Sequence, residues 1–265
     1  MAVPIPTVTP QRERNLGNPL LIAAVFCSTI AIFVVNMMRS PYVYSDPRFV
    51  VSFFSTELQV AGWLLFTTAL LFPPKRLGLR WPQRGSLKQA APMFLLLLTA
   101  LGVWAFARLH IKPGAVLDNS MSLQILRTTL VVGVTEEWIF RGLLFAAFSR
   151  WFGLRKGALL ALVLFGCFHL LNIAVGVPVP LALFQLCSTI LIGSTLALGA
   201  LGTRSLLLPM VVHGLYDFAV IDAERAVVAG APALSMAAIP LMGLALGIFC
   251  LVSLFRLQAS EPYPD

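Results

Sequence analysis

The stretch VTEEWIFRGLLF, residues 134–145, places two carboxylates and a guanidinium inside a long apolar segment. The surrounding chain has 265 residues, of which 58% are hydrophobic and 11% are charged, and its mean hydropathy is +0.88. Soluble domains carry roughly 25% charged residues, so this composition excludes an ordinary soluble protein. Apolar runs of about 20 residues, the length that crosses a bilayer, recur along the whole sequence. We therefore predict an all-α polytopic membrane protein without a soluble domain.

The apolar runs predict about eight transmembrane helices, which we number one to eight along the chain. They cover residues 20–38, 49–72, 90–109, 123–149, 157–177, 179–201, 205–221 and 234–255. The Pro-rich, polar start predicts a disordered cytoplasmic tail over residues 1–18, followed by spans one to three within 19–122. Residues 123–222 hold the spans that carry charged motifs, and residues 223–265 hold the last span and a short tail.

The distribution of Lys and Arg predicts the orientation in the membrane. With the N-terminus inside, twelve of these residues fall in inside segments and five in outside segments, which predicts that both termini are cytoplasmic. Attraction to anionic lipid accounts for the net charge of +8, so nucleic-acid binding is not indicated. The basic loop over residues 73–88 is expected to face lipid headgroups, with substrate binding as the alternative. The compact plan favours a bacterial inner membrane.

Charged residues inside the predicted spans need partners, because a Glu or Arg near the centre of a membrane helix costs roughly 2.5 to 3.5 kcal/mol. Glu137 and Arg141 are four residues apart with Glu first, which is the favourable spacing for an ion pair. Glu136 is rotated by about 100° from Glu137 and has no such partner on its own helix, so it must face another span. By the same argument, Glu57 and Arg127 are expected to form a structural ion pair in the outer half of the membrane.

Two of the three histidines lie inside predicted spans and are the candidates to meet Glu136. FGCFHLLN, residues 165–172, places His169 on span five, and VVHGLYDF, residues 211–218, places His213 on span seven with Asp217 one turn later. At ~1.5 Å per residue, Glu136 and the two histidines lie roughly 12 to 21 Å from the cytoplasmic ends of their spans. Each residue alone could be a hydrogen-bonded packing residue. Together they indicate a water-filled catalytic pocket formed by spans four, five and seven.

Three motifs on these spans resemble those of a known family. EEWIFR (136–141), FGCFH (165–169) and HGLYD (213–217) are similar to the EExxxR, FxxxH and HxxxN/D motifs of the CPBP family, also called Abi, which includes CAAX proteases and bacteriocin-processing enzymes. The order of the motifs and the spacing within each one match. The resemblance covers about residues 123–221, so it identifies residues 123–222 as the expected catalytic core.

The resemblance implies an intramembrane endopeptidase that cuts a membrane-anchored protein or peptide. Glu136 would activate a water molecule with the help of His169. His213 and Asp217 would stabilise the oxyanion or hold the site together, and Asp217, which replaces the more frequent Asn, is expected to orient His213. Supporting roles are expected for the remaining motif positions and for an asparagine near the second motif, for which polar packing is the alternative: Glu137, Arg141 and Asn172.

Several alternatives remain open at the level of sequence. Glu136, His169 and His213 are acceptable Zn²⁺ ligands by type, but the chain has no HExxH motif, so we favour a mechanism without a cofactor. A non-proteolytic immunity or scaffold protein of the same family is the alternative function, and a transporter is less favoured because paired Gly/Pro interruptions are missing.

The four cysteines lie inside predicted spans and show no CxxC spacing, which predicts free thiols: Cys27, Cys167, Cys187 and Cys250. Cys167 lies two residues before His169, about 200° around a helix, so we expect a packing residue rather than a nucleophile.

Overall fold

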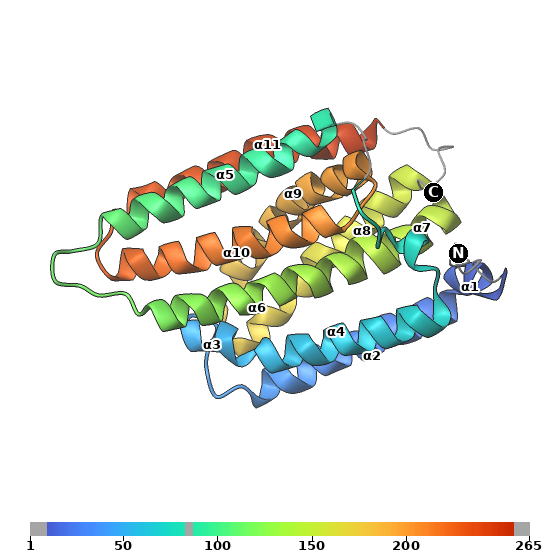
Figure 1. Cartoon of the computed structure of the whole chain (residues 1–265), viewed down its shortest axis with the longest axis horizontal. Helices are drawn as coiled ribbons and strands as arrows, with labels where there is room; N and C mark the ends of the chain where they lie inside the picture. The colour runs from blue at the N-terminus through green and yellow to red at the C-terminus, as the bar shows by residue number, and fades with distance from the viewer. Residues whose placement is uncertain (1–9, 83–86, 257–265) are drawn as a thin grey trace, which may run out of the picture.

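The computed structural model of the protein describes residues 10–82 and 87–256, which form a bundle of helices aligned along one long axis (Figure 1). The α-helices are α1 (Pro10–Leu16), α2 (Pro19–Arg39), α3 (Pro47–Ser52), α4 (Phe54–Leu71), α5 (Leu87–Leu109), α6 (Asn119–Glu137), α7 (Phe145–Phe152), α8 (Leu154–Phe168), α9 (Val179–Thr203), α10 (Leu207–Val228) and α11 (Ala238–Phe255). A π-helix, η2 (Trp138–Leu144), and three 3₁₀-helices, η1 (Pro74–Leu77), η3 (His169–Val175) and η4 (Ala233–Ala237), complete the described elements. The described residues contain no strand, which confirms the all-α fold.

Polar caps and prolines set the beginnings of several helices. The side chain of Asn18 accepts hydrogen bonds from the backbone N–H groups of Leu20 and Leu21, and a proline occupies the first turn of α2. Asp118 caps α6 in the same way, with its carboxylate 2.8 Å from the backbone nitrogen of Ser120. These caps satisfy N–H groups that the helix itself cannot satisfy.

Each of the eight predicted spans corresponds to a helical segment, but six helical segments are long and apolar enough to cross a membrane on their own. Among the described residues these are Pro19–Arg39, Pro47–Leu71, Lys88–Leu109, Leu154–Val175, Val179–Thr203 and Ala233–Phe255. The other two are the segment from α6 through η2 to α7 and helix α10, which carry the first and third motifs. The apolar helices indicate an integral membrane protein, whereas the count of eight spans and the cytoplasmic side remain predictions.

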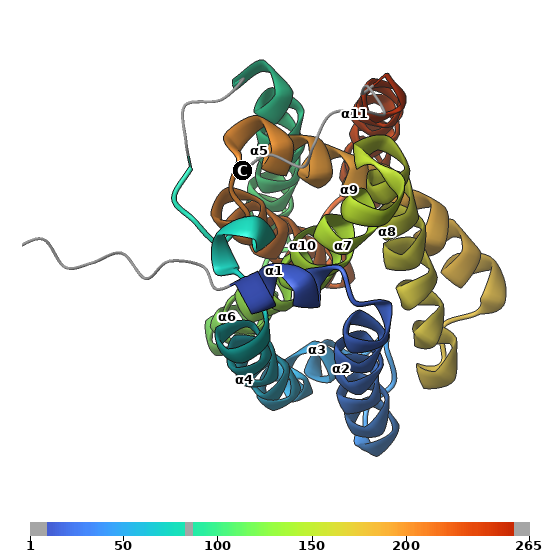
Figure 2. The ribbon, with the colours of Figure 1, turned by 90° about the vertical axis from the view of Figure 1, so that its right-hand side faces the viewer.

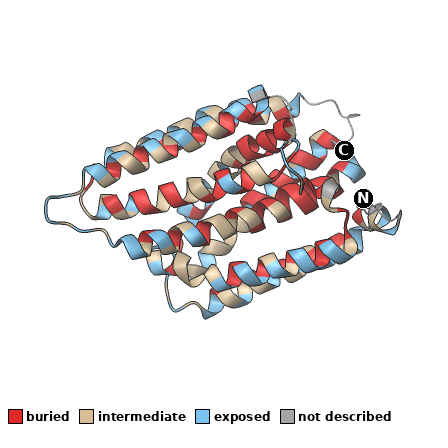
Figure 3. Ribbon diagram, viewed as in Figure 1, coloured by how far each residue is buried: buried red, intermediate tan, exposed pale blue. Residues whose placement is uncertain are grey.

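The bundle exposes large apolar side chains, as expected for a protein surrounded by lipid, and buries several ionisable side chains within its apolar core. Buried residues concentrate on the helix sides that face the centre (Figure 3). Large apolar side chains cover the outside, among them Leu65, Phe66, Leu98, Phe184, Leu241 and Phe249. The buried interior holds ionisable side chains: Glu57, Glu136, Glu137, Arg141, His213 and Asp222.

Helices α6 and α10 lie against each other in the middle of the bundle, between α4 and α5, as the end-on view shows (Figure 2). Their backbones approach closely at two glycines. A Cβ atom added to Gly133 would lie 2.7 Å from the backbone nitrogen of Gly214, and one added to Gly214 would lie 2.7 Å from the Cα atom of Leu130. Small residues permit such close crossings of membrane helices. This crossing brings the first and third motifs together.

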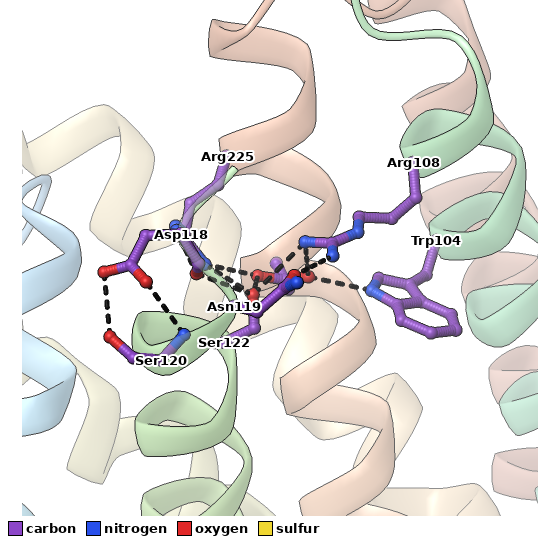
Figure 4. A network of polar contacts seen from close by, with 8 residues as sticks. Trp104, Arg108, Asp118, Asn119, Ser120, Ser122 and Arg225 are labelled. Atoms are coloured by element: carbon purple, nitrogen blue, oxygen red, sulfur yellow. Dashed lines mark hydrogen bonds and ion pairs between the residues drawn. The ribbon is translucent and has the colours of Figure 1, made fainter. Parts of the chain in front are cut away.

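A polar network joins α5, α6 and α10 near one end of the bundle (Figure 4). The fully buried carboxylate of Asp222 accepts hydrogen bonds from Trp104 (2.9 Å) and Arg108 (3.2 Å) at Oδ2. Its Oδ1 atom accepts from Ser122 (2.8 Å) and Arg225 (2.5 Å). The network therefore balances one buried carboxylate with two arginines, and the sequence did not indicate it.

Two expectations about the N-terminal half are wrong. Within the predicted disordered tail, residues 1–9 lie outside the described residues, whereas Pro10–Leu16 forms helix α1. The predicted ion pair between Glu57 and Arg127 is not formed. Glu57 instead pairs with the hydroxyl of Thr135, and the guanidinium of Arg127 lies 4.5 Å from the centre of the Phe54 ring.

The basic loop and the cysteines give mixed outcomes. Residues 83–86 of the loop lie outside the described residues, but Arg80 donates a 2.7 Å hydrogen bond to the carbonyl of Arg204 and so ties the loop to the end of α9. The four cysteines are free thiols, as predicted. Cys167, which we expected to be a packing residue rather than a nucleophile, is exposed on the surface of α8.

Candidate active site

The carboxylate of Glu137 lies at the centre of the candidate site. It is fully buried, and its Oε1 atom lies 3.0 Å from Nη1 of Arg141, which confirms the predicted ion pair. The same oxygen lies 2.9 Å from Nδ1 of His213 on α10. Glu137 therefore does more than pair along its own helix, because it also links the first motif to the third.

The backbone leaves the α-helical form at this motif. Helix α6 ends at Glu137 and continues as the π-helix η2, which carries Arg141. Short π-helical segments are rare and occur often at functional sites. Arg141 is buried, and Gly193 on α9 makes room for it, since a Cβ atom there would lie 2.5 Å from Nη2.

The two ring nitrogens of His213 face different carboxylates. Nδ1 donates to Glu137, because a carboxylate oxygen accepts. Nε2 lies 3.7 Å from Oε2 of Glu136 and 3.5 Å from Oδ2 of Asp217. The Glu136 side chain is 9% exposed and the Asp217 side chain 28%, so Asp217 is the most accessible of these groups. The structure thus brings three of the four predicted catalytic residues into one cluster.

His169, the fourth predicted residue, occupies the point where α8 changes into the 3₁₀-helix η3. Its Nδ1 atom lies 2.9 Å from the carbonyl oxygen of Phe165. A carbonyl oxygen accepts, so Nδ1 carries the proton and Nε2 of the neutral ring has a free lone pair. The half-buried imidazole is therefore held in the form that can accept a proton.

The side chain of Phe165 connects the three motifs. Its ring makes edge-to-face contacts with His169, at 4.9 Å between ring centres, and with His213, at 6.0 Å. The guanidinium of Arg141 lies 4.1 Å from the centre of the same ring. The first position of the FxxxH motif therefore has a packing role at the site, which the analysis of charged residues alone missed.

Residues 118–219 match the family model described as Rce1-like, type II CAAX prenyl endopeptidase. The CPBP resemblance is confirmed over this segment. The CPBP-like segment runs from the N-cap of α6 into α10 and contains all three motifs, and the matched family is a family of membrane proteases. No curated protein and no solved structure matches the chain.

Asn172, in the CPBP-like segment, makes the contacts of polar packing, the alternative to its expected supporting role. Its amide nitrogen donates to Oε1 of Gln185 at 3.0 Å, and Gln185 in turn donates to the hydroxyl of Tyr44 at 2.9 Å. The imidazole of His169 is oriented by the carbonyl of Phe165. Asn172 therefore has the alternative role of polar packing, in which it links η3 to α9 and to the loop before α3.

The zinc-ligand set suggested by residue type is not assembled in the CPBP-like segment. In the part of the chain that the structure describes, no three His, Cys, Asp or Glu side chains are arranged to hold a metal ion. A tetrahedral zinc site needs ligand atoms about 2.0 to 2.2 Å from one point. The described residues therefore show no assembled zinc site at Glu136, His169 and His213.

Proposed function

We propose that the protein is an intramembrane endopeptidase that hydrolyses a peptide bond in a membrane-anchored protein or peptide. The observation that carries the proposal is the convergence of Glu136 and Asp217 on Nε2 of His213 inside an apolar bundle. A packing role does not require two carboxylates around one imidazole nitrogen, and their burial is costly in a membrane. The match to a protease family supports the same reaction class.

In the proposed reaction, Glu136 acts as the general base. It takes a proton from a water molecule that also donates a hydrogen bond to Nε2 of His169, and the water oxygen attacks the carbonyl carbon of the substrate. The C–N bond then breaks as Glu136 returns the proton to the leaving nitrogen, so the products are a carboxylic acid and an amine. No step of this scheme is assigned to a metal.

His213 is the proposed source of positive charge for the carbonyl oxygen of the substrate. When both of its ring nitrogens carry protons, Nδ1–H is held by Glu137 and Nε2–H points to the region between Glu136 and Asp217. A donor in this place stabilises negative charge that develops on an oxygen. Asp217 favours the charged form of His213 and orients its ring, while Arg141 holds Glu137 in place.

The substrate class follows from the location of the site and from the matched family. Buried carboxylates are reached most readily by a substrate that is itself anchored in the membrane. The family description names prenylated CAAX ends, so a prenylated CAAX peptide is the first substrate to test.

The test compares protein termini in membranes that contain the wild-type chain or Glu136→Gln at matched expression. Glu224→Gln serves as the control, because it removes the same charge from an exposed position on α10. We expect new protein termini in the wild-type and Glu224→Gln membranes that are missing from the Glu136→Gln membranes. Wild-type protein purified with a chelator should still produce them. The unfolding temperature of Glu136→Gln must equal that of the wild type for the comparison to hold. Identical termini in all samples would then contradict proteolysis and favour an immunity or scaffold role.

A further inference from the structure

Glu57 is a buried carboxyl group that the proposed reaction does not use. It lies on α4, outside the segment that matches the protease family, and is 2% exposed. Within the described residues it pairs with no basic side chain. Its partner is the hydroxyl of Thr135, at 2.5 Å from Oε2, and Thr135 directly precedes the proposed general base Glu136. Glu57 is thus hydrogen-bonded to the residue that directly precedes Glu136 on α6.

The hydrogen bonds of Thr135 indicate the protonation state of Glu57. The hydroxyl oxygen of Thr135 lies 3.0 Å from the carbonyl oxygen of Val132 and 3.2 Å from that of Val131. A hydroxyl has one hydrogen to donate, and both carbonyl oxygens accept. If Glu57 carries a proton, it donates to Thr135, and Thr135 donates to α6. If Glu57 is ionised, Thr135 must turn to it, and a buried carboxylate remains without a cation.

The surrounding charges favour the protonated form. Glu57 lies within electrostatic range of the carboxyl groups of Glu136 and Asp217 and of the imidazole of His213. Two acidic groups face it against one basic group, so an ionised Glu57 would add a further negative charge to an acidic cluster. An unpaired charge is costly in an apolar interior, whereas a neutral acid with a hydrogen-bond partner is tolerated. A neutral Glu57 also does not oppose the ionisation of Glu136, which the proposed reaction needs.

We propose that Glu57 is a neutral carboxylic acid that positions Glu136 through Thr135. The inference rests on the proposed function, because it assigns Glu57 to the geometry of the general base. A second contact supports the same coupling between α4 and the first motif, since Trp138, the first residue of η2, donates a 3.1 Å hydrogen bond to Thr68. The apolar helix α4 therefore contributes a positioning residue to a site whose motifs all lie on other helices.

The test uses Glu57→Gln, which keeps a neutral donor of similar shape, and Glu57→Leu, which removes it. We expect Glu57→Gln to cleave within about twofold of the wild-type rate and with the same pH–rate profile, because a neutral donor replaces a neutral donor. Glu57→Leu and Thr135→Val should each cleave about three- to tenfold more slowly, and the double variant should be no slower than either single one.

Two results would overturn the inference. A Glu57→Gln variant that is as slow as Glu57→Leu, or that shifts the pH–rate profile, would show that the ionised carboxylate or its proton is used. Wild-type cleavage by Glu57→Leu would show that Glu57 is structural only, whatever its effect on the unfolding temperature.

An infrared difference spectrum separates this inference from the proposed function, because it needs no substrate. The wild type should show the carbonyl band of a protonated carboxylic acid near neutral pH, and Glu57→Gln should lack it. The absence of any such difference would overturn the neutral-acid assignment. If neither the wild type nor any variant cleaves peptides while this band is present, the proposed function fails but the protonation state of Glu57 stands.

Discussion

Gly214→Ala tests whether the close crossing of α6 and α10 sets the geometry of the site. An added Cβ atom at Gly214 would lie 2.7 Å from the Cα atom of Leu130 and 2.7 Å from the carbonyl oxygen of Thr129, while ordinary contacts begin at 3.4 Å. Both neighbours are backbone atoms of α6, which cannot turn aside as a side chain can. The two helices must therefore separate by about 0.7 Å at this point.

That separation acts directly on the adjacent histidine. If it is transmitted along the line between the two groups, the distance from His213 Nδ1 to Glu137 Oε1 grows from 2.9 Å to about 3.6 Å, which is no longer a hydrogen bond. Loss of a hydrogen bond to a charged group costs about 1.5 to 3 kcal/mol. At ~1.4 kcal/mol for each factor of ten, cleavage should fall roughly 10- to 100-fold. Overpacking should also lower the stability by about 1 to 3 kcal/mol.

The assay measures Glu136-dependent cleavage and the unfolding temperature of the purified protein in detergent. Gly102→Ala is the matched control, because an added Cβ atom there meets nothing within 4 Å. Gly133→Ala should reproduce the defect from the other helix, since its Cβ atom would lie 2.7 Å from the nitrogen of Gly214. Wild-type cleavage and stability in Gly214→Ala would refute the idea that this crossing positions His213.

Two further predictions concern residues that charge patterns did not indicate. Gly193→Ala should displace Arg141, whose Nη2 atom would lie 2.5 Å from the new Cβ atom, and should slow cleavage about tenfold, whereas Gly243→Ala, with its nearest contact at 3.5 Å, should not. Equal rates for both variants would contradict this role of Gly193. Asp222→Asn should lower the free energy of unfolding by about 3 kcal/mol, because two arginines lose their shared buried partner, and chemical denaturation with Asp46→Asn as a surface control checks this. A denaturation midpoint equal to that of Asp46→Asn would remove the structural role of the network.

Local spacing predicted the parts of the site that lie within one helix. The pair formed by Glu137 and Arg141 and the pair formed by His213 and Asp217 both follow the i, i+4 rule, and both are present. The cost of burying charge in lipid also predicted that Glu136 must find a partner on another helix. These inferences succeed because they depend on helix geometry and on solvation, which act in every membrane helix.

Contacts between helices could not be predicted in the same way. Which carboxylate meets His213, and through which nitrogen, depends on how closely two helices approach, and that distance is set by glycines that carry no charge or hydropathy signal. The same limit explains the wrong partner for Glu57. Its placement in the outer half suggested a nearby arginine, but the packing of α4 on α6 offered the hydroxyl of Thr135 instead. Two residues at a similar depth in the membrane need not be in contact, because helices that carry them can lie on different sides of the bundle.

The helices that carry most of the proposed catalytic residues are those that depend most on their neighbours. Helices α6 and α10 are missing from the six segments that can cross a membrane by length and composition, and the buried face of α6 is rich in small and polar residues such as Ser122, Thr128 and Gly133. Alone in lipid, each would expose carboxylates at a cost of roughly 2.5 to 3.5 kcal/mol apiece near the bilayer centre. In the bundle, α6 lies between α4 and α10, and α10 lies between α6 and α5, so the charges meet each other. The apolar helices therefore stabilise a polar pair that could not persist alone, and a substitution that loosens α4 or α5 should impair catalysis as well as folding.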